Sequence, residues 1–213
     1  MEIIDNRALL LKVRNPDRIT AVIPKSKVLE DDGQVAQVLV NWDLEEAIVL
    51  KNLRIKDVPS PINATYKWPG LFKPFEHQKT TASFLTMHKR SFCFNEQGTG
   101  KTASVIWAAD YLMTKGIIKR VLVICPLSIM DSAWRNDLFK FAMHRRVDVA
   151  YGKPEKRREI IASDAEFVVI NYDGVEIVAS DIMAGGFDLI VVDEANAYKN
   201  PSTKRWKVLN KIG

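Results

Sequence analysis

Apolar residues in the second half of the chain form short continuous runs, and longer segments of helical spacing separate these runs. Runs that are apolar on both faces are typical of parallel strands covered by helices on each side. The expected strands are 91–94, 121–125, 147–151, 167–170 and 188–192. The expected helices are a run through residue 85, then 102–114, 131–141, a segment ending near 162, 175–183 and a segment beginning at 202. This alternation predicts an α/β domain with a doubly wound, mostly parallel sheet.

The first part of the chain follows a different pattern. Its expected strands are the β-like runs 8–13 and 19–23 and the partly alternating run 34–41. Asp43, with a glutamate three residues later, is a capping-box-like start for a helix that runs to about Leu53. The expected organisation is a small β-rich unit with one helix at 1–60, a proline-containing linker at 61–71 and the α/β domain at 72–213. The pattern leaves open whether the first unit is a structural or partner-binding appendage or contacts DNA.

The composition is that of an ordinary globular protein, with 47% apolar and 27% charged residues in a chain of 213. No apolar run reaches the ~20 residues of a membrane helix, and the N-terminal residues lack the pattern of a signal peptide. These features predict a cytoplasmic protein without a membrane partner. Cys93 and Cys125 lie in apolar runs without a neighbouring His or Cys, which predicts reduced, buried thiols rather than a metal site. A net charge of +5 permits binding to nucleic-acid phosphates but does not require it.

The octapeptide at 95–102, Asn-Glu-Gln-Gly-Thr-Gly-Lys-Thr, has the features of a phosphate-binding loop. It lies between an expected strand and an expected helix, so that backbone N–H groups and the helix N-terminus would attract an anion. The residues expected to bind the nucleotide are Gly98, Thr99, Gly100, Lys101 and Thr102. The lysine would reach the β- and γ-phosphates, and the second threonine would offer its hydroxyl to Mg²⁺. The strict pattern has Gly where this chain has Asn95, a residue type that tolerates a left-handed backbone.

The sequence therefore predicts binding of ATP or GTP with Mg²⁺ at this loop, and the alternative is an ordinary strand–helix turn. Ahead of the loop, Gln78 can pair with an adenine edge because its amide both donates and accepts hydrogen bonds. A surface glutamine at a helix start is the alternative interpretation. The same segment contains His77, which is interpreted as a packing residue rather than a catalyst.

Polar residues follow three of the expected strands, at the edge where doubly wound sheets bind ligands. These segments are 126–128, 171–172 and 193–194. Asp193 can hold Mg²⁺ directly or through water, and Glu194 can orient and deprotonate an attacking water. An acid pair after an apolar strand is often only a polar strand exit. In one alternating unit with a phosphate loop, the pair favours metal-assisted phosphoryl chemistry.

Five segments, in order, resemble motifs of the Swi/Snf-type DNA translocases of helicase superfamily two. Residues 187–200, with Asp-Glu-Ala-Asn followed by Lys-Asn, resemble the Asp-Glu-Ala-His…Lys-Asn signature of that family. Residues 96–102 resemble its nucleotide loop, which usually lacks the first Gly of the strict pattern. The other similar segments are 75–78, which resembles the Gln-bearing adenine motif, 123–128 followed by Trp134, and 169–172. The resemblance covers about residues 72 to 200 and is to members of the phage or bacterial type.

This resemblance implies a RecA-like P-loop lobe that binds ATP and Mg²⁺ and couples ATP hydrolysis to movement on double-stranded DNA. It implies that Gln78 contacts adenine, that Asp193 organises Mg²⁺ together with Thr102, and that Glu194 acts as the base. The residues that it places along the DNA are Ser128, Asn171, Tyr172 and, with an ion-pair role as the alternative, Lys199. The basic run 153–158 is interpreted as a solvated turn, with a DNA contact as the alternative.

The chain departs from the family pattern at two points. Asn196 stands where the family has a His that links the ATP state to the DNA-binding side, so we expect altered coupling. The family also has a second RecA-like lobe with arginine fingers, and the sequence ends at Gly213, before the family's third motif. Because such a finger is worth ~10³–10⁵ in rate, we expect residues 1–213 alone to bind ATP·Mg²⁺ weakly and to hydrolyse it very slowly.

Three other functions are consistent with some or all of the same motifs. A strand-separating superfamily-two helicase, acting on DNA or RNA, would share all of them. A non-motor module could keep the nucleotide fold as a scaffold for a partner. A P-loop kinase would share the loop but has no reason to carry the Asp-Glu-Ala-Asn segment.

Overall fold

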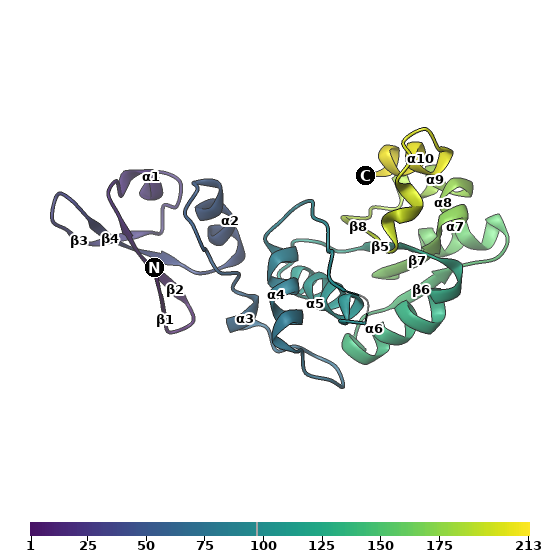
Figure 1. Cartoon of the computed structure of the whole chain (residues 1–213), viewed down its shortest axis with the longest axis horizontal. Coiled ribbons are helices and arrows are strands. Elements are labelled where there is room, and N and C mark those ends of the chain that lie inside the picture. The colour runs from purple at the N-terminus through teal and green to yellow at the C-terminus, as the bar shows by residue number, and fades with distance from the viewer. Residues whose placement is uncertain (97) are drawn as a thin grey trace. The chain divides into compact units, whose positions relative to one another are not determined.

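The computed structural model describes residues 1–96 and 98–213 and divides the chain into two compact units (Figure 1). The first unit comprises 1–67 and 79–94, and the second comprises 68–78 and 95–213. These bounds differ from the expected division at 61–71, because 79–94 returns to the first unit. Side-chain hydrogen bonds explain this return: the Lys51 ammonium donates to the carbonyl of Met87 at 3.0 Å, and the hydroxyls of Ser60 and Thr86 lie 2.8 Å apart. A break in composition along the chain cannot reveal such a non-contiguous unit.

A four-stranded antiparallel sheet, in the order β1-β2-β4-β3, forms the first unit. Its strands are β1 (Glu2–Ile4), β2 (Ala8–Val13), β3 (Lys27–Asp31) and β4 (Ala36–Asn41). Alternate residues of the two central strands are buried, as expected for a sheet with one covered face; they include Leu9 and Leu11 in β2 and Val38 and Val40 in β4.

Three helices lie wholly within the first unit, α1 (Asp17–Thr20), α2 (Leu44–Asn52) and α3 (Ile62–Thr65). A fourth, α4 (Glu76–Thr86), begins in the second unit and continues into the first. The helix expected from Asp43 is α2, and the Asp43 side chain accepts a hydrogen bond from the Leu44 backbone N–H at 2.8 Å. The strand expected at 19–23 is wrong. This segment is the end of α1 and a turn, because its apolar residues Ile19 and Ile23 are buried at a helical spacing of four.

The second unit contains a sheet of four parallel strands in the order β6-β7-β5-β8. Its strands are β5 (Val121–Cys125), β6 (Val147–Ala150), β7 (Phe167–Asn171) and β8 (Leu189–Val192). Its helices are α5 (Lys101–Thr114), α6 (Asn136–Phe141), α7 (Pro154–Ala162), α8 (Tyr172–Ile177), α9 (Ala179–Ala184) and α10 (Lys204–Ile212). A π-helix at Met130–Arg135 and 3₁₀ turns at Leu127–Ile129 and Ala195–Tyr198 complete the unit.

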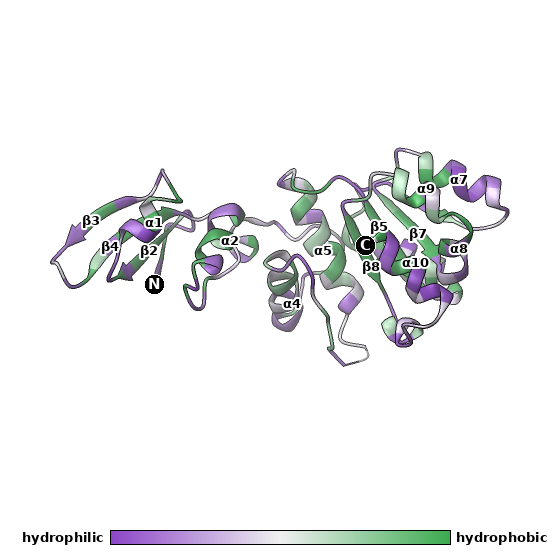
Figure 2. Ribbon diagram, turned by 90° about the horizontal axis from the view of Figure 1, so that it is seen from above, coloured by the Kyte–Doolittle hydropathy of each residue, from purple (hydrophilic) through white to green (hydrophobic). Residues whose placement is uncertain are grey.

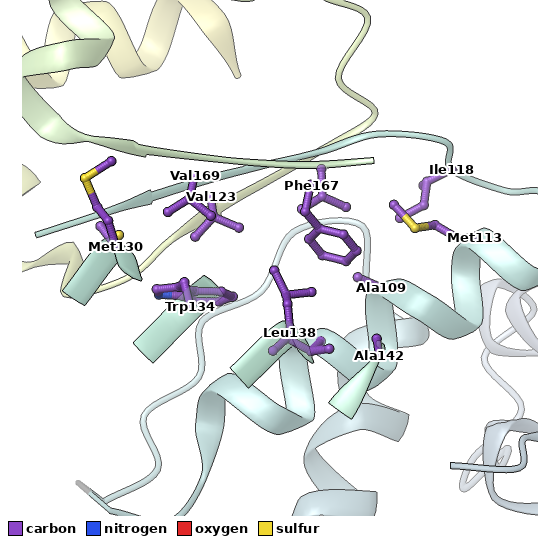
Figure 3. Close-up of a cluster of buried hydrophobic side chains, with 13 residues drawn as sticks. Ala109, Met113, Ile118, Val123, Met130, Trp134, Leu138, Ala142, Phe167 and Val169 are labelled. Atoms are coloured by element: carbon purple, nitrogen blue, oxygen red, sulfur yellow. The ribbon is translucent and has the colours of Figure 1, made fainter. Parts of the chain in front are cut away.

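Two hydrophobic cores, one on each face of this sheet, hold the second unit together. In β5, Val121, Val123 and Cys125 point to one core, while Leu122 and Ile124 point to the other. The first core is closed by α5, the π-helix and α6, with Trp134 and Leu138 packed against the strands (Figure 3). The second core is closed by α7, α8, α9 and part of α10. Helices thus cover both faces of apolar strands (Figure 2), which confirms the predicted doubly wound α/β fold.

The expected strand at 91–94 is wrong, because the structure gives this segment no regular element. Phe92 is 74% exposed and Phe94 is 89% exposed, and their rings stack on one another at 5.7 Å. A short apolar run becomes a strand only when a neighbouring strand pairs with it. In the described part of the chain, β8 is an edge strand and the ladder ends there.

The two cysteines are both free thiols, but they differ in burial. Cys125 is fully buried, and burial, together with the charge of Asp193, raises the pKa of its thiol to about 12. Cys93 is only partly buried, so the prediction of two buried thiols is wrong for this residue. Across the described residues, no helix combines the length and apolarity needed to cross a membrane.

We expect a thiol reagent at pH 8 to modify Cys93 in the folded protein and to leave Cys125 unmodified, because only a thiolate reacts and burial suppresses its formation. Mass spectrometry of peptides after a timed reaction measures both rates. The same reaction in denaturant should modify the two thiols equally. Equal rates in the folded protein would contradict the burial of Cys125.

Candidate functional site

The loop at 95–102 contains two glycines with left-handed backbone conformations. Gly98 has φ of +81° and Gly100 has φ of +75°, and Gly100 is the N-cap of α5. Non-glycine residues adopt this conformation only at a cost, so the turn into the helix depends on glycine here. Asn95 does not have a positive φ, so the left-handed backbone that asparagine tolerates is not adopted at this position. Gln97 lies outside the described residues.

The ammonium of Lys101 lies over the loop. It donates hydrogen bonds to the carbonyls of Asn95 at 2.9 Å and Glu96 at 3.0 Å. Lys101 is also the first residue of α5, whose N-terminus carries a partial positive charge. The loop therefore gathers a cation and a helix N-terminus at one point, which is the arrangement that a polyphosphate prefers. Thr102 is the next residue of the same helical turn and is partly buried.

Gln78 supports the loop directly. Its amide nitrogen donates to the carbonyl of Thr99 at 3.3 Å, and its amide oxygen accepts from the Phe75 backbone N–H at 2.9 Å. A Cβ at Gly100 would lie 2.1 Å from the Gln78 amide nitrogen, so this glycine is also needed for close approach. The amide is buried against the loop, which excludes the interpretation of Gln78 as an ordinary surface residue. Adenine contact by Gln78 stays a prediction.

His77 is a loop contact that the sequence did not indicate. Its Nε2 lies 2.9 Å from the carbonyl of Thr99, the same atom to which Gln78 donates. The ring of Phe75 stacks on the His77 ring at 5.7 Å with an interplanar angle of 10°. An exposed aromatic pair thus lies beside the loop, where a flat base could stack. The only signal in the sequence was the position of these residues next to Gln78.

The acids Asp193 and Glu194 follow β8 at its carboxyl end. The backbone N–H of Asp193 donates to the carbonyl of Ile124 in the neighbouring strand at 2.9 Å. The two carboxylate oxygens of Asp193 accept from the Glu194 backbone N–H and from the indole N–H of Trp134, each at 2.9 Å. Glu194 has φ of +52°, a left-handed backbone that glutamate rarely adopts. Strained residues of this kind persist where the surroundings fix them, often at functional sites.

Trp134 comes from the π-helix and is almost fully buried in the first core. Short π-helices are frequent at functional sites, because the wider turn redirects a side chain. The sequence placed a helix over 131–141 and noted Trp134 as part of a motif, but it did not indicate that the indole reaches Asp193. That contact spans 59 residues of sequence.

The side chain of Asn171 is buried at the end of β7. Its amide oxygen accepts from the Arg157 guanidinium at 3.0 Å, and Arg157 also donates to the carbonyls of Ala150 at 2.6 Å and Gly152 at 2.9 Å. Arg157 is buried, so the interpretation of 153–158 as a solvated turn is wrong at this residue. The Asn171 side chain therefore supports the interior through its hydrogen bond with Arg157. The predicted contact of this segment with DNA would have to be made by neighbouring exposed atoms.

The other predicted DNA contacts occupy different settings. The Tyr172 phenol donates to the backbone carbonyl of Asp193 at 2.6 Å and lies 3.2 Å from that of Glu194. Burial and the nearby Asp193 charge raise the pKa of Tyr172, so the phenol stays protonated as a donor. Ser128 and Lys199 are both exposed. The structure therefore brings Tyr172, but not Ser128 or Lys199, into hydrogen-bonding contact with the acids.

The donor chemistry of the acid site fits Mg²⁺, which binds to one or two carboxylates and keeps several waters. The predicted ligands, the Thr102 hydroxyl and the Asp193 carboxylate, are hard oxygen donors. In the part of the chain that the structure describes, no three His, Cys, Asp or Glu side chains converge as a metal cluster. Lys101 donates its hydrogen bonds to loop carbonyls, and the Asp193 carboxylate accepts from Trp134, so the loop and the acid share no hydrogen-bond partner. A Mg²⁺ site between the loop and the acid stays a prediction.

Comparisons with known proteins place this site in a family. The model of the SNF2-related domain matches residues 77–213. An uncharacterised ATP-dependent helicase of Bacillus subtilis, YqhH, is 26% identical over 86% of this chain and 32% of its own length. Helicase SWR1 of Saccharomyces cerevisiae is 28% identical over 80% of this chain and 11% of its own length.

A solved structure of the Sulfolobus solfataricus SWI2/SNF2 ATPase core in complex with double-stranded DNA is similar, with a TM-score of 0.59 and 28% identity. The match covers 68% of this chain and 31% of the archaeal chain. The chain thus spans about a third of the length of the bacterial relative and of the archaeal core. Because the domain model matches more than half of the chain, including the loop and the acid pair, the chain belongs to the SNF2-related domain family.

Proposed function

We propose that residues 68–213 bind ATP and Mg²⁺ and contribute to DNA-stimulated ATP hydrolysis that drives movement on double-stranded DNA. The observation that carries the proposal is the fixed Asp193–Glu194 pair at the end of a parallel strand, within the matched domain. An ordinary polar strand exit needs no buried indole donor and no left-handed glutamate. The loop at 95–102 adds the cation and the helix N-terminus that a polyphosphate requires.

Each group has a role that its position supports. Lys101 would exchange its two carbonyl partners for phosphate oxygens, and Gln78 and the Phe75–His77 pair would receive the adenine. Thr102 and Asp193 would hold Mg²⁺, which neutralises developing phosphate charge when bound. The carboxylate of Glu194 is exposed and would accept the proton of the attacking water.

The proposed track is duplex DNA, and it rests on family membership and on the net charge of +5. Ser128, Asn171, Tyr172 and Lys199 remain the predicted contacts. We also propose that fast hydrolysis needs a second RecA-like lobe, on the same or a separate polypeptide, because the family resemblance places arginine fingers there.

Stimulation of ATP hydrolysis by different nucleic acids tests the proposal. We expect duplex DNA to raise the single-turnover rate more than single-stranded DNA or RNA of the same length, and we expect the effect to weaken with salt. A Glu194→Gln variant, which keeps the size of the side chain, is the control for contaminating activity. Stronger stimulation by single strands would favour the strand-separating helicase. Equal rates for wild type and Glu194→Gln would reject hydrolysis at this site.

A further inference from the structure

The Asp193–Glu194 segment is held by groups from four parts of the second unit. Ile124 in β5 accepts from the Asp193 N–H, Trp134 in the π-helix donates to the Asp193 carboxylate, and Tyr172 in α8 donates to the Asp193 carbonyl. The fourth contact closes the following turn, where the Ala197 N–H donates to the Glu194 carbonyl at 3.1 Å. A left-handed glutamate needs such support, because its relaxed backbone would point the carboxylate elsewhere.

The Tyr172 hydroxyl is the contact that acts on both acids. Its oxygen lies 2.6 Å from the Asp193 carbonyl and 3.2 Å from the Glu194 carbonyl, so its single proton is shared, mainly with the nearer oxygen. The peptide between these two residues, whose orientation sets the left-handed turn, is thus fixed from outside its own strand.

The ring that carries this hydroxyl is itself fixed. It packs edge-to-face on Tyr198 with centroids 5.5 Å apart, and the guanidinium of Arg205 lies 5.8 Å from its centroid. Arg205 is held in turn by an ion pair of 2.5 Å with Asp173, the residue after Tyr172. The Tyr172 hydroxyl therefore approaches the acids from a ring at the start of α8 that Tyr198 and Arg205 contact.

We propose that Tyr172 is a positioning residue whose hydroxyl holds the Asp193–Glu194 peptide in the orientation that presents the glutamate carboxylate to the reacting water. This inference rests on the proposed function. It assigns to Tyr172 a role toward the acids in addition to the DNA contact that the resemblance implies. It also gives a physical link, since a shift of the segment at 171–173 moves the hydroxyl and with it the acids.

The test is a Tyr172→Phe variant, which removes the hydroxyl and keeps the ring. Tyr198→Phe is the matched control, because the Tyr198 hydroxyl is buried in the same ring pair without a hydrogen-bond partner among the described residues. Hydrogen exchange of the backbone amides at 193–197 is measured first, without nucleotide. ATP affinity and single-turnover hydrolysis with duplex DNA are then measured on the same two variants.

We expect Tyr172→Phe to speed exchange of the Glu194 and Ala197 amides about fivefold and to lower the hydrolysis rate about 10- to 100-fold. ATP affinity should change less than about twofold, because the loop at 95–102 is untouched. The Tyr198→Phe protein should match wild type in exchange, affinity and rate.

Equal exchange in the two variants would overturn the inference, and so would faster exchange without a slower hydrolysis rate. A different result would reject the proposed function instead. If the wild-type protein does not bind ATP·Mg²⁺ at all, that function fails, while the exchange rates still decide whether the hydroxyl holds the acids.

Discussion

Replacing Lys101 by alanine is expected to weaken ATP binding by about 10- to 150-fold, the range that follows from losing one hydrogen bond to a charged group. The ammonium lies over the loop, where it donates to the carbonyls of Asn95 and Glu96. The phosphates of ATP can replace those carbonyls as acceptors of the Lys101 hydrogen bonds. A titration of fluorescent ATP, with Mg²⁺ present, measures the change.

Lys115→Ala is the matched control for this prediction, because Lys115 caps the opposite end of the same helix. It removes the same charge, yet it should leave ATP affinity within about twofold of wild type, since charge acts on a helix end only within its first or last turn. Unfolding in urea should show that Lys101→Ala alters stability by about 1 kcal/mol or less, as expected for an exposed contact. Unchanged ATP affinity in Lys101→Ala would favour the non-motor scaffold.

The second large effect is expected at Asp110, a buried carboxylate on α5. Arg145 donates to one of its oxygens at 2.5 Å, and His144 lies 2.8 Å from the same atom. Arg145 also donates to Glu166 at 2.7 Å. Burial opposes the charge on Arg145, but its hydrogen bonds to the two carboxylates outweigh burial and raise the pKa of the guanidinium. The network ties α5 to the loop before β6 and to the residue before β7.

We expect Asp110→Asn to lower the free energy of unfolding by about 3 kcal/mol, because removing one partner of a buried pair leaves the other charge poorly compensated. Asp131→Asn is the control. Asp131 pairs with Arg135 at 3.3 Å in an exposed i,i+4 contact, which contributes about 0.5 kcal/mol or less. Urea unfolding of both variants measures the difference. Similar losses in the two variants would show that burial does not strengthen the Asp110 network.

Local pattern was sufficient for the elements that are long, strongly periodic or apolar on both faces. The strands β5, β7 and β8 lie where the sequence predicts them, because their continuous apolar runs are typical of a sheet covered on both sides. The helices α5 and α7 also lie where the sequence predicts them. Pattern was insufficient at 19–23 and 91–94. A short apolar run has no period of its own, and its conformation depends on what packs or pairs with it.

Sequence alone determined which chemical groups the second unit carries: a Gly-Lys-Thr loop at the start of a helix, an acid pair after an apolar strand, and the order of the motifs between them. These follow from residue type and spacing. Tertiary structure alone decided what holds those groups. Trp134 reaches Asp193 across 59 residues, Tyr172 reaches it across 21, and Arg157 occupies the amide of Asn171. Contacts of that kind arise because parallel strands bring their carboxyl ends to one edge, and no local pattern records which side chains meet there.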